Sequence, residues 1–284
     1  MSANHYENFP VASVLCPPAL RPAIRAIYAY ARTADDIADE GHASAPERLA
    51  DLAAYGADLE RAARGVPTSG RWDGVFTPLA PVIAAHRLPV ALLADLLDAF
   101  AQDVVKQRYA DRAELLDYCR RSANPVGRLL LHLYGVDDAL ALRRSDAICT
   151  ALQLSNFWQD LGVDSGRGRI YLPATDCARH GIGSDQILAQ VDDPRLRAAV
   201  AEVCGWTAAL MDEGAPLAHT IGGRAGFELR LVVQGGRRIL QKIAAIDHAT
   251  MATRPTIAWH DAPLLLWRAL QMRPVHRLRA EGAA

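Results

Sequence analysis

Apolar residues recur along most of this chain at intervals of three and four positions, the spacing that lines one face of an α-helix. The clearest stripe runs through residues 89–106, where Val90, Leu93, Leu97 and Phe100 share one side. The same periodicity predicts further helices over about residues 18–40, 46–65, 111–135, 139–163, 195–217, 225–246 and 261–271.

No segment alternates apolar and polar residues as a half-buried strand does, and no Asn-Gly or Asp-Gly turn separates two alternating runs. Irregular segments are predicted near residues 65–76, 164–184 and 248–260. No repeat or linker divides the chain. We therefore predict an all-α protein with one domain over residues 1–284, in which the core covers about residues 5–272 and a basic tail follows.

Composition excludes several classes of protein. Of the 284 residues, 51% are hydrophobic, while the net charge of −1 provides no field for binding nucleic acid. The five cysteines are far apart and form no CxxC pair, which argues against structural zinc and a disulfide framework and fits the cytoplasm. Neither a signal peptide nor an apolar run of bilayer length is visible.

Acidic side chains are concentrated in the predicted helix over residues 18–40. At about 100° per residue, Tyr28, Arg32, Asp35 and Asp39 fall within roughly 60° of one another. Apolar or small residues surround this stripe, so its charges need partners if the helix is buried.

A second polar stripe follows on the predicted helix over residues 139–163. Gln153, Asn156, Asp160 and Asp164 are spaced by three, four and four positions, which places them within roughly 80° on a helix. The rest of this helix is apolar on nearly every side, as in a buried helix.

Each stripe alone is typical of a solvated face, and an ion pair with an arginine such as Arg32 is a second structural interpretation. The two stripes together favour a shared cation, because like charges facing inward would otherwise repel. Carboxylate and amide oxygens are ligands for a hard ion such as Mg²⁺, which Mn²⁺ can replace. Mg²⁺ commonly completes its ligand shell with water and substrate phosphates, so the pattern favours a buried diphosphate site.

The segments "YAYARTADDIADE", "YCRRSANPVGRLLLHLYG" and "LQLSNFWQDLGVDSGRGRIYLP" resemble, in this order, motifs of the squalene and phytoene synthase family. The resemblance covers about residues 5–245. It implies an isoprenoid-synthase helical bundle with a central cavity and a prenyl diphosphate substrate.

The resemblance also implies roles for single residues. The metal ligands would be Asp35, Asp39, Asn156, Asp160 and Asp164. Substrate contacts would come from the diphosphate-side residues Tyr28 and Arg32 and from Gln153, with Arg169 and Tyr171 either beside phosphate or in a structural loop.

A helix break at Asn124, Pro125 and Gly127 also matches the family, which places such a break in the cavity wall. An ordinary loop between two helices is the alternative. The prolyl residue removes a backbone donor, and the glycine adds backbone freedom.

One departure from the family bears on the substrate. In "HYENF", His5 is kept, but Tyr6 and Glu7 stand where many members have a hydroxyl and a cation that bind diphosphate. A site for two diphosphates would be weakened there, unless these residues touch nothing. The chain is thereby most similar to the hydroxysqualene synthase branch of hopanoid biosynthesis.

That branch implies capture of the cation from presqualene diphosphate by water to give hydroxysqualene, and NADPH is not expected. A head-to-head synthase that makes squalene, phytoene or presqualene diphosphate is the alternative enzyme. A non-catalytic prenyl diphosphate-binding subunit is the alternative of another class. Association with other enzymes of the hopanoid pathway stays open.

The basic C-terminal tail has two interpretations. It places Arg273, Arg277 and Arg279 after the apolar residues Trp267 and Leu270. A solvated terminus is one interpretation, and peripheral contact with the anionic inner face of a membrane is the other.

Overall fold

The structure is a computed structural model that describes residues 15–272. Within this range it contains no strand, only one isolated bridge between Arg108 and Ile170, and the all-α prediction is confirmed. His5, Tyr6, Glu7 and the tail from residue 273 lie outside the described residues. The helices are α1 (Arg21–Asp39), α2 (Ala45–Ala63), α3 (Asp73–His86), α4 (Val90–Val105), α5 (Arg112–Ser122), α6 (Asn124–Leu133), α7 (Ala139–Gln159), α8 (Leu161–Gly166), α9 (Ala174–Arg179), α10 (Ser184–Leu188), α11 (Pro194–Gly214), α12 (Leu217–Thr220), α13 (Gly223–Ala245), the 3₁₀ turn η1 (Trp259–Asp261) and α14 (Ala262–Gln271).

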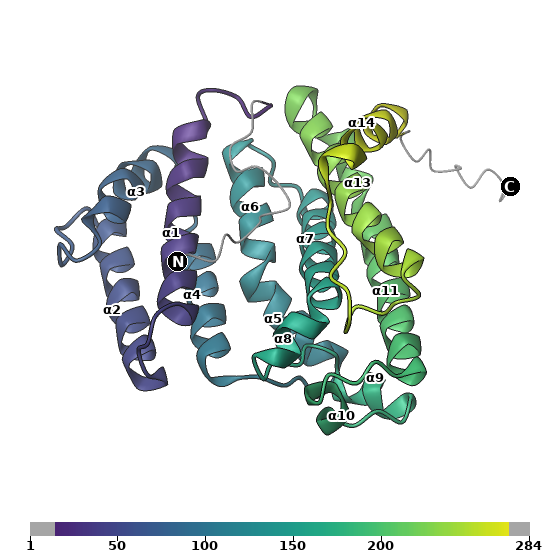
Figure 1. Cartoon of the computed structure of the whole chain (residues 1–284). Coiled ribbons are helices and arrows are strands. Elements are labelled where there is room, and N and C mark those ends of the chain that lie inside the picture. Colours follow the sequence, from purple (N-terminus) through teal and green to yellow (C-terminus); the bar gives the residue numbers. More distant parts are fainter. Residues whose placement is uncertain (1–14, 273–284) are drawn as a thin grey trace, which may run out of the picture.

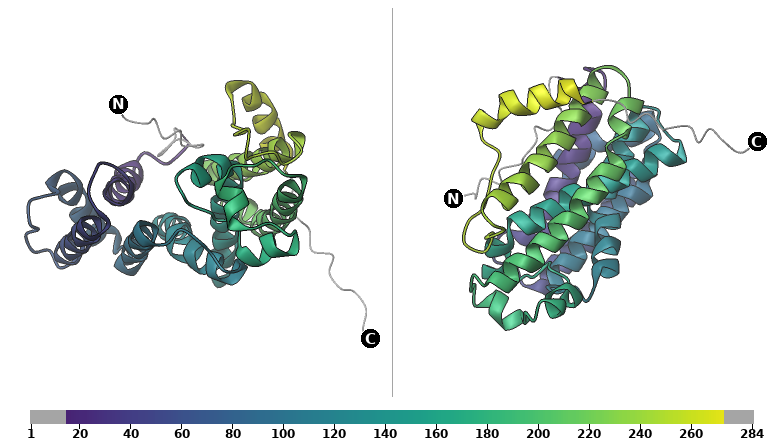
Figure 2. Two further views of the ribbon diagram at one scale, coloured as in Figure 1. Left: turned by 60° about the horizontal axis from the view of Figure 1, so that its bottom comes forward. Right: turned by 90° about the vertical axis from the view of Figure 1, so that its right-hand side faces the viewer.

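The long helices lie side by side in an open arc (Figures 1 and 2). Helices α1 to α4 form one end of the arc around an apolar cluster to which α6 also contributes. Helices α7, α11 and α13 belong to the other end and share two further clusters. Helix α6 therefore joins the two ends, because its apolar side chains enter clusters of both.

Helix α7 is buried on most of its sides, as the apolar pattern predicts. Trp158 is fully buried, and its indole nitrogen donates to the hydroxyl of Thr207 on α11 at 2.7 Å. Gly214 brings α11 close to α7, since a β-carbon there would stand 2.6 Å from the carbonyl oxygen of Arg144. The second polar stripe is therefore carried by a firmly packed helix.

The predicted break before α6 is present, and its described contacts are structural. Helix α5 ends at Ser122, and α6 begins at Asn124. The side-chain oxygen of Asn124 accepts a hydrogen bond from Thr150 on α7 at 3.0 Å. A β-carbon on Gly127 would lie 2.4 Å from the hydroxyl of Ser145, so the glycine allows close packing of α6 on α7.

Several elements differ from the prediction. Helix α9 lies within residues 164–184, where an irregular segment is predicted, and no helix is predicted at α10. Helix α3 occupies residues 73–86, where no helix is expected, and it contains Pro78 and Pro81. The predicted helix over residues 139–163 is divided at Asp160, which separates α7 from α8. Within residues 15–272, no helix is long and apolar enough to cross a bilayer.

Candidate active site

The first acidic stripe lies along the C-terminal half of α1, where Arg32 gathers the nearby carboxylates. Its guanidinium nitrogens lie 3.2 Å from an oxygen of Asp35, 2.6 Å from Asp36 and 3.0 Å from Glu40. Asp35 therefore forms the ion pair with Arg32 that the second structural interpretation predicts. Asp39, one turn further, instead faces another part of the chain.

The second stripe runs from α7 into α8 without losing its spacing. The backbone nitrogen of Asp160 donates to the backbone carbonyl oxygen of Asn156 at 2.9 Å. The backbone nitrogen of Asp164 donates to the backbone carbonyl oxygen of Asp160 at 2.8 Å. The four-residue periodicity therefore continues through the break, and Gln153 lies one turn earlier on α7. Asp160 also accepts from the guanidinium of Arg254, with a shortest distance of 2.5 Å.

One ion pair joins the first stripe to the segment that directly follows the second stripe. The guanidinium of Arg169, which follows α8, donates to a carboxylate oxygen of Asp39 at 2.7 Å. Arg167 lies 3.6 Å from the other oxygen of Asp39. Gly168 between them adopts φ +82°, a left-handed conformation that glycine takes without strain. Residues 130 positions apart thus meet at one place.

Burial and like charges act on Asp164. Burial, reinforced by the charges of Asp160 and Asp39, raises the pKa of Asp164 to about 7, although Arg169 and Arg167 oppose the shift. Because Asp39 and Asp164 come from different stripes, the two stripes belong to one electrostatic cluster.

A further carboxylate belongs to this cluster, and the sequence analysis missed it. Asp103 on α4 accepts from the hydroxyl of Tyr118 at 2.6 Å, and its other oxygen has no hydrogen-bond partner within residues 15–272. Burial raises the pKa of Asp103 to about 6. Tyr118 and Arg169 lower that pKa, whereas the charges on α1 raise it.

Aromatic rings lie beside the charged cluster. The ring of Tyr171 stacks on Phe157 with centroids 3.7 Å apart and planes 7° apart, and it also stacks on Tyr109. Tyr171 is buried, as is Phe157. These contacts favour the structural interpretation of Tyr171. Tyr28 lies on α1, as the sequence analysis expects, and is partly exposed.

The predicted metal ligands have the chemistry that a hard divalent cation requires, although their carboxylates do not converge on a single site. Four carboxylates and one amide supply only oxygen ligands toward the cluster, as Mg²⁺ prefers. The raised pKa values of Asp103 and Asp164 show that added positive charge would be favourable there. In the described part of the chain, no three His, Cys, Asp or Glu side chains converge closely enough to hold a metal alone, and arginines pair with Asp39 and Asp160.

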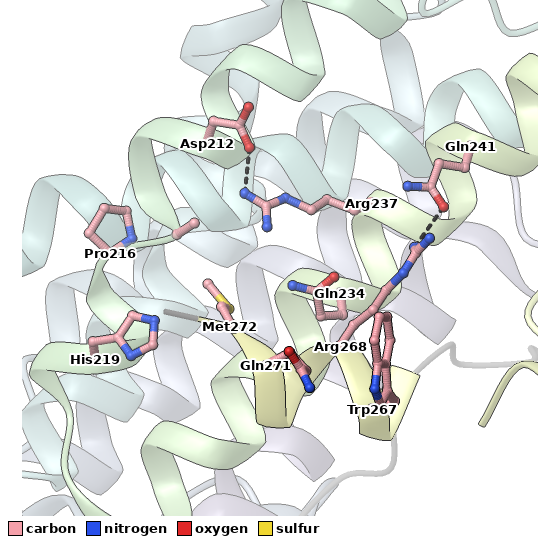
Figure 3. Close-up of a pocket in the computed structure, with 11 residues that line it drawn as sticks. Asp212, Pro216, His219, Gln234, Arg237, Gln241, Trp267, Arg268, Gln271 and Met272 are labelled. Atoms are coloured by element: carbon pink, nitrogen blue, oxygen red, sulfur yellow. Dashed lines mark hydrogen bonds and ion pairs between the residues drawn. The ribbon is translucent and has the colours of Figure 1, made fainter. Parts of the chain in front are cut away.

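A cavity of about 590 Å³ lies elsewhere, between α11, α13 and α14 (Figure 3). Its lining includes Gln234, Arg237, Trp267 and Arg268, and no residue of either acidic stripe. Figure 3 shows Arg237 directed to Asp212 and Arg268 to Gln241. This cavity therefore does not belong to the acidic cluster.

Sequence reasoning missed Asp103, Arg167 and Arg254 for different reasons. Asp103 is one of three aspartates in a mostly apolar helix, and its spacing from Asp95 and Asp98 does not distinguish it. Arg254 lies in an irregular segment far along the chain from Asp160, so no periodicity connects them. Arg167 lies two positions before Arg169 in the same Gly-Arg-Gly-Arg segment, so no spacing separates its role from that of Arg169.

Comparisons with known proteins identify the family. The sequence model described as squalene/phytoene synthase matches residues 2–266. Hydroxysqualene synthase of Rhodopseudomonas palustris is 35% identical over 243 residues, 85% of this chain and 80% of that protein. The protein of the same name from Sinorhizobium fredii is 31% identical over 248 residues, 86% and 82% of the two chains.

A solved structure agrees with these relatives. The crystal structure of squalene synthase HpnC from Alicyclobacillus acidocaldarius superposes with a TM-score of 0.78 at 38% identity, covering 86% of this chain and 90% of that one. The helical fold of this chain is therefore shared with that solved structure. The chain belongs to the squalene/phytoene synthase family.

Proposed function

We propose that this protein ionises presqualene diphosphate and lets water capture the cation, which gives hydroxysqualene and diphosphate. The observation that carries the proposal is the Arg169–Asp39 pair, because it brings cations beside both acidic stripes. The names of the relatives from R. palustris and S. fredii support the choice of reaction.

The chemistry asked of the site is the departure of a diphosphate. The C–O bond breaks with both electrons passing to the diphosphate, water forms a new C–O bond to the cation, and one water proton ends on the released diphosphate. Arg167, Arg169 and Arg254 stabilise the leaving charge, since preorganised cations act best where charge develops. Their carboxylate partners hold these guanidinium groups in place before substrate arrives.

A divalent cation would be bound by Asp35, Asp39, Asn156, Asp160 and Asp164 together with phosphate oxygens. When bound, Mg²⁺ supplies positive charge that favours ionisation of the C–O bond. With the cation on Asp39 and Asp160, the guanidinium groups of Arg169 and Arg254 that pair with these carboxylates would be available to phosphate oxygens. Mn²⁺ substitutes, and zinc and NADPH are not required.

A second candidate is the head-to-head condensation of two farnesyl diphosphates. It is favoured by the likeness to the structure called squalene synthase HpnC. The two candidates share the acidic cluster and the ionisation step, and they differ in whether one or two diphosphates must be held.

Product analysis with each substrate separately distinguishes them. Purified protein with Mg²⁺ is offered presqualene diphosphate or farnesyl diphosphate, each with and without NADPH. We expect hydroxysqualene from presqualene diphosphate without NADPH, little product from farnesyl diphosphate, and no turnover after EDTA treatment. Efficient formation of presqualene diphosphate or squalene from farnesyl diphosphate would overturn the assignment in favour of the second candidate.

The role of the bridging arginine has its own test. We expect Arg169→Gln to lower kcat by about 100-fold, because one preorganised group that stabilises developing charge is lost. The matched control is Arg195→Gln, since Arg195 pairs with Asp193 at the surface and away from the acidic cluster. Near-normal turnover by Arg169→Gln would show that the Arg169–Asp39 pair is only structural.

A further inference from the structure

The carboxylate of Asp103 has one oxygen that the folded chain leaves unsatisfied. Asp103 lies on α4, and its Oδ2 accepts a hydrogen bond from the hydroxyl of Tyr118 at 2.6 Å. Its Oδ1 is shielded from solvent, and within residues 15–272 no donor reaches it. A buried acceptor without a partner costs free energy, so we expect this oxygen to have a partner that is not part of the fold.

The other carboxylates of the acidic cluster are already engaged. Guanidinium groups pair with three of them, Asp35, Asp39 and Asp160. Asp164 continues the second stripe and is a predicted metal ligand. Asp103 lies on neither stripe, and no ion pair of its carboxylate is found in the described part of the chain. Its Oδ1 can therefore accept a hydrogen bond from a substrate or a water molecule.

Asp103 lies where the charged cluster meets a group of aromatic rings. The charges of Asp35 and Asp39 act on it from α1, and that of Arg169 acts on it from the segment after α8. Its hydrogen-bond partner on α5 belongs to the aromatic group, which consists of Tyr109, Tyr118, Phe157 and Tyr171. A cation forms at the carbon that the diphosphate leaves, so it arises close to this boundary.

We infer that Asp103 is the base that takes a proton from the water molecule that captures the cation. The inference rests on the proposed function, because it concerns the same cation. The water oxygen gives an electron pair to the cationic carbon and forms the C–O bond. One O–H bond then breaks, its electron pair stays on oxygen, and the proton passes to Oδ1 of Asp103. The carboxylic acid gives this proton to the released diphosphate, which restores the carboxylate.

Two features suit Asp103 to this step. The hydroxyl of Tyr118 holds Oδ2, so the direction of Oδ1 is fixed before substrate arrives. A water molecule that donates to Oδ1 keeps its lone pairs for the cation, so one hydrogen bond both places and activates it. Burial raises the pKa of Asp103 to about 6, so at neutral pH the group is mostly ionised and is a stronger base than an exposed aspartate.

The ratio of hydroxysqualene formed to diphosphate released tests the inference, because it separates capture of the cation from its formation. The wild type and Asp103→Asn are each given presqualene diphosphate and Mg²⁺, and both products are quantified in the same reaction. Asparagine keeps the size of the side chain but is not a base. We expect the ratio to fall by about tenfold or more in Asp103→Asn, with the cation instead losing a carbon-bound proton to the diphosphate and forming alkenes.

Two further variants separate a chemical role from a structural one. Asp98→Asn alters an exposed aspartate of the same helix and should keep the wild-type ratio. Tyr118→Phe removes the hydroxyl but keeps the carboxylate, so the ratio should fall far less than in Asp103→Asn, whatever the overall rate. An unchanged ratio in Asp103→Asn, or an equal fall in Tyr118→Phe, would overturn the inference. Because the ratio counts only substrate that has reacted, partial unfolding of a variant does not alter it.

The same experiment keeps the role of Asp103 apart from the proposed function. Absence of hydroxysqualene from the wild-type reaction would refute the proposed function, and the role of Asp103 as a base would fall with it. Hydroxysqualene from the wild type, with the same ratio in Asp103→Asn, would overturn the role of Asp103 alone.

Discussion

At the scale of single residues, three carboxylates of the acidic cluster are paired with arginine and none of these three with lysine. Arg32, Arg169 and Arg254 hold carboxylates of the two stripes, while the chain contains only two lysines. A guanidinium presents several donors in a fixed plane, so it can contact a carboxylate and a phosphate oxygen at the same time. The cluster is therefore prepared for an anion with several oxygens.

Asp103 gives a prediction about pH and stability. Its pKa is 3.8 in an unfolded chain and about 6 in the fold, chiefly because of burial. Ionisation therefore opposes folding, and the stability present below about pH 4 is lost as the pH rises through 6. In EDTA at about pH 8, Asp103→Asn should be more stable than the wild type by about 1–2 kcal/mol.

Urea unfolding at several pH values measures this difference. The difference should vanish below about pH 3, where Asp103 is protonated in both the folded and the unfolded chain. Asp98→Asn on the exposed side of the same helix serves as control and should show no such pH-dependent gain. A destabilised Asp103→Asn would mean that its hydrogen bond with Tyr118 outweighs the burial of charge.

At the scale of the elements, glycine decides how closely α11 approaches α7. A β-carbon on Gly214 would meet backbone atoms of α7 at 2.6 and 2.9 Å, whereas one on Gly205 would meet nothing within 4 Å. Gly214→Ala should therefore destabilise the protein by about 1–3 kcal/mol. Gly205→Ala in the same helix should stabilise it by up to about 1 kcal/mol, because alanine has the higher helix propensity.

Differential scanning calorimetry of the two variants provides the check. The opposite signs matter more than the magnitudes, since the substitution and the helix are the same. Equal shifts in Tm would show that α11 moves readily on α7 and that the close approach is not required.

The buried carboxylate of Asp261 holds the segment that follows Arg254 against α13. Asp261 is buried and accepts from Arg238 at 2.8 Å, from Lys242 at 2.5 Å and from the backbone of Ala258 at 2.9 Å. Although burial raises the pKa of Asp261, these hydrogen bonds lower it well below its usual range. Its contribution to stability is therefore complete above about pH 4 and is lost as the pH falls further.

Asp261→Asn should destabilise the protein by about 3 kcal/mol at neutral pH, because two cations lose their buried partner. Asp212→Asn is the control, since Asp212 is 66% exposed and pairs with the neighbouring Arg237. Loss of this surface ion pair should lower the free energy of unfolding by less than about 1 kcal/mol. Equal effects of the two substitutions on urea unfolding would contradict the assignment of Asp261 as the fixing group.

At the scale of the whole molecule, the acidic cluster joins α1, α4, α8 and the segment after α13, so its ligands should stabilise the whole fold. Mg²⁺ and inorganic diphosphate together should raise Tm more than either alone, because each completes the site for the other. Differential scanning fluorimetry measures the shift. The shift should be lost in Asp160→Asn/Asp164→Asn, and a shift kept by this variant would place the binding elsewhere.

The sequence permits prediction of most helices and both acidic stripes, because periodicity within one helix is local information. Helix α3 could not be predicted in this way, since Pro78 and Pro81 are read as breakers although their fixed φ is compatible with a helix. The pairing of Asp160 with Arg254 depends on how distant segments pack, and neither stripe contains that information. The two stripes together predict a shared site, and the resemblance to the family adds Arg169 as a candidate beside it.

The ion pair between Arg169 and Asp39 has a consequence for folding kinetics. It closes a loop of 130 residues, and the Arg254–Asp160 pair closes one of 94. The entropy of closing such loops must be lost before the contacts contribute any stability. Helices α1 to α4 can thus collapse on their own apolar cluster well before a diphosphate site exists. During refolding, diphosphate binding should appear only with the last cooperative phase, later than the recovery of helical circular dichroism.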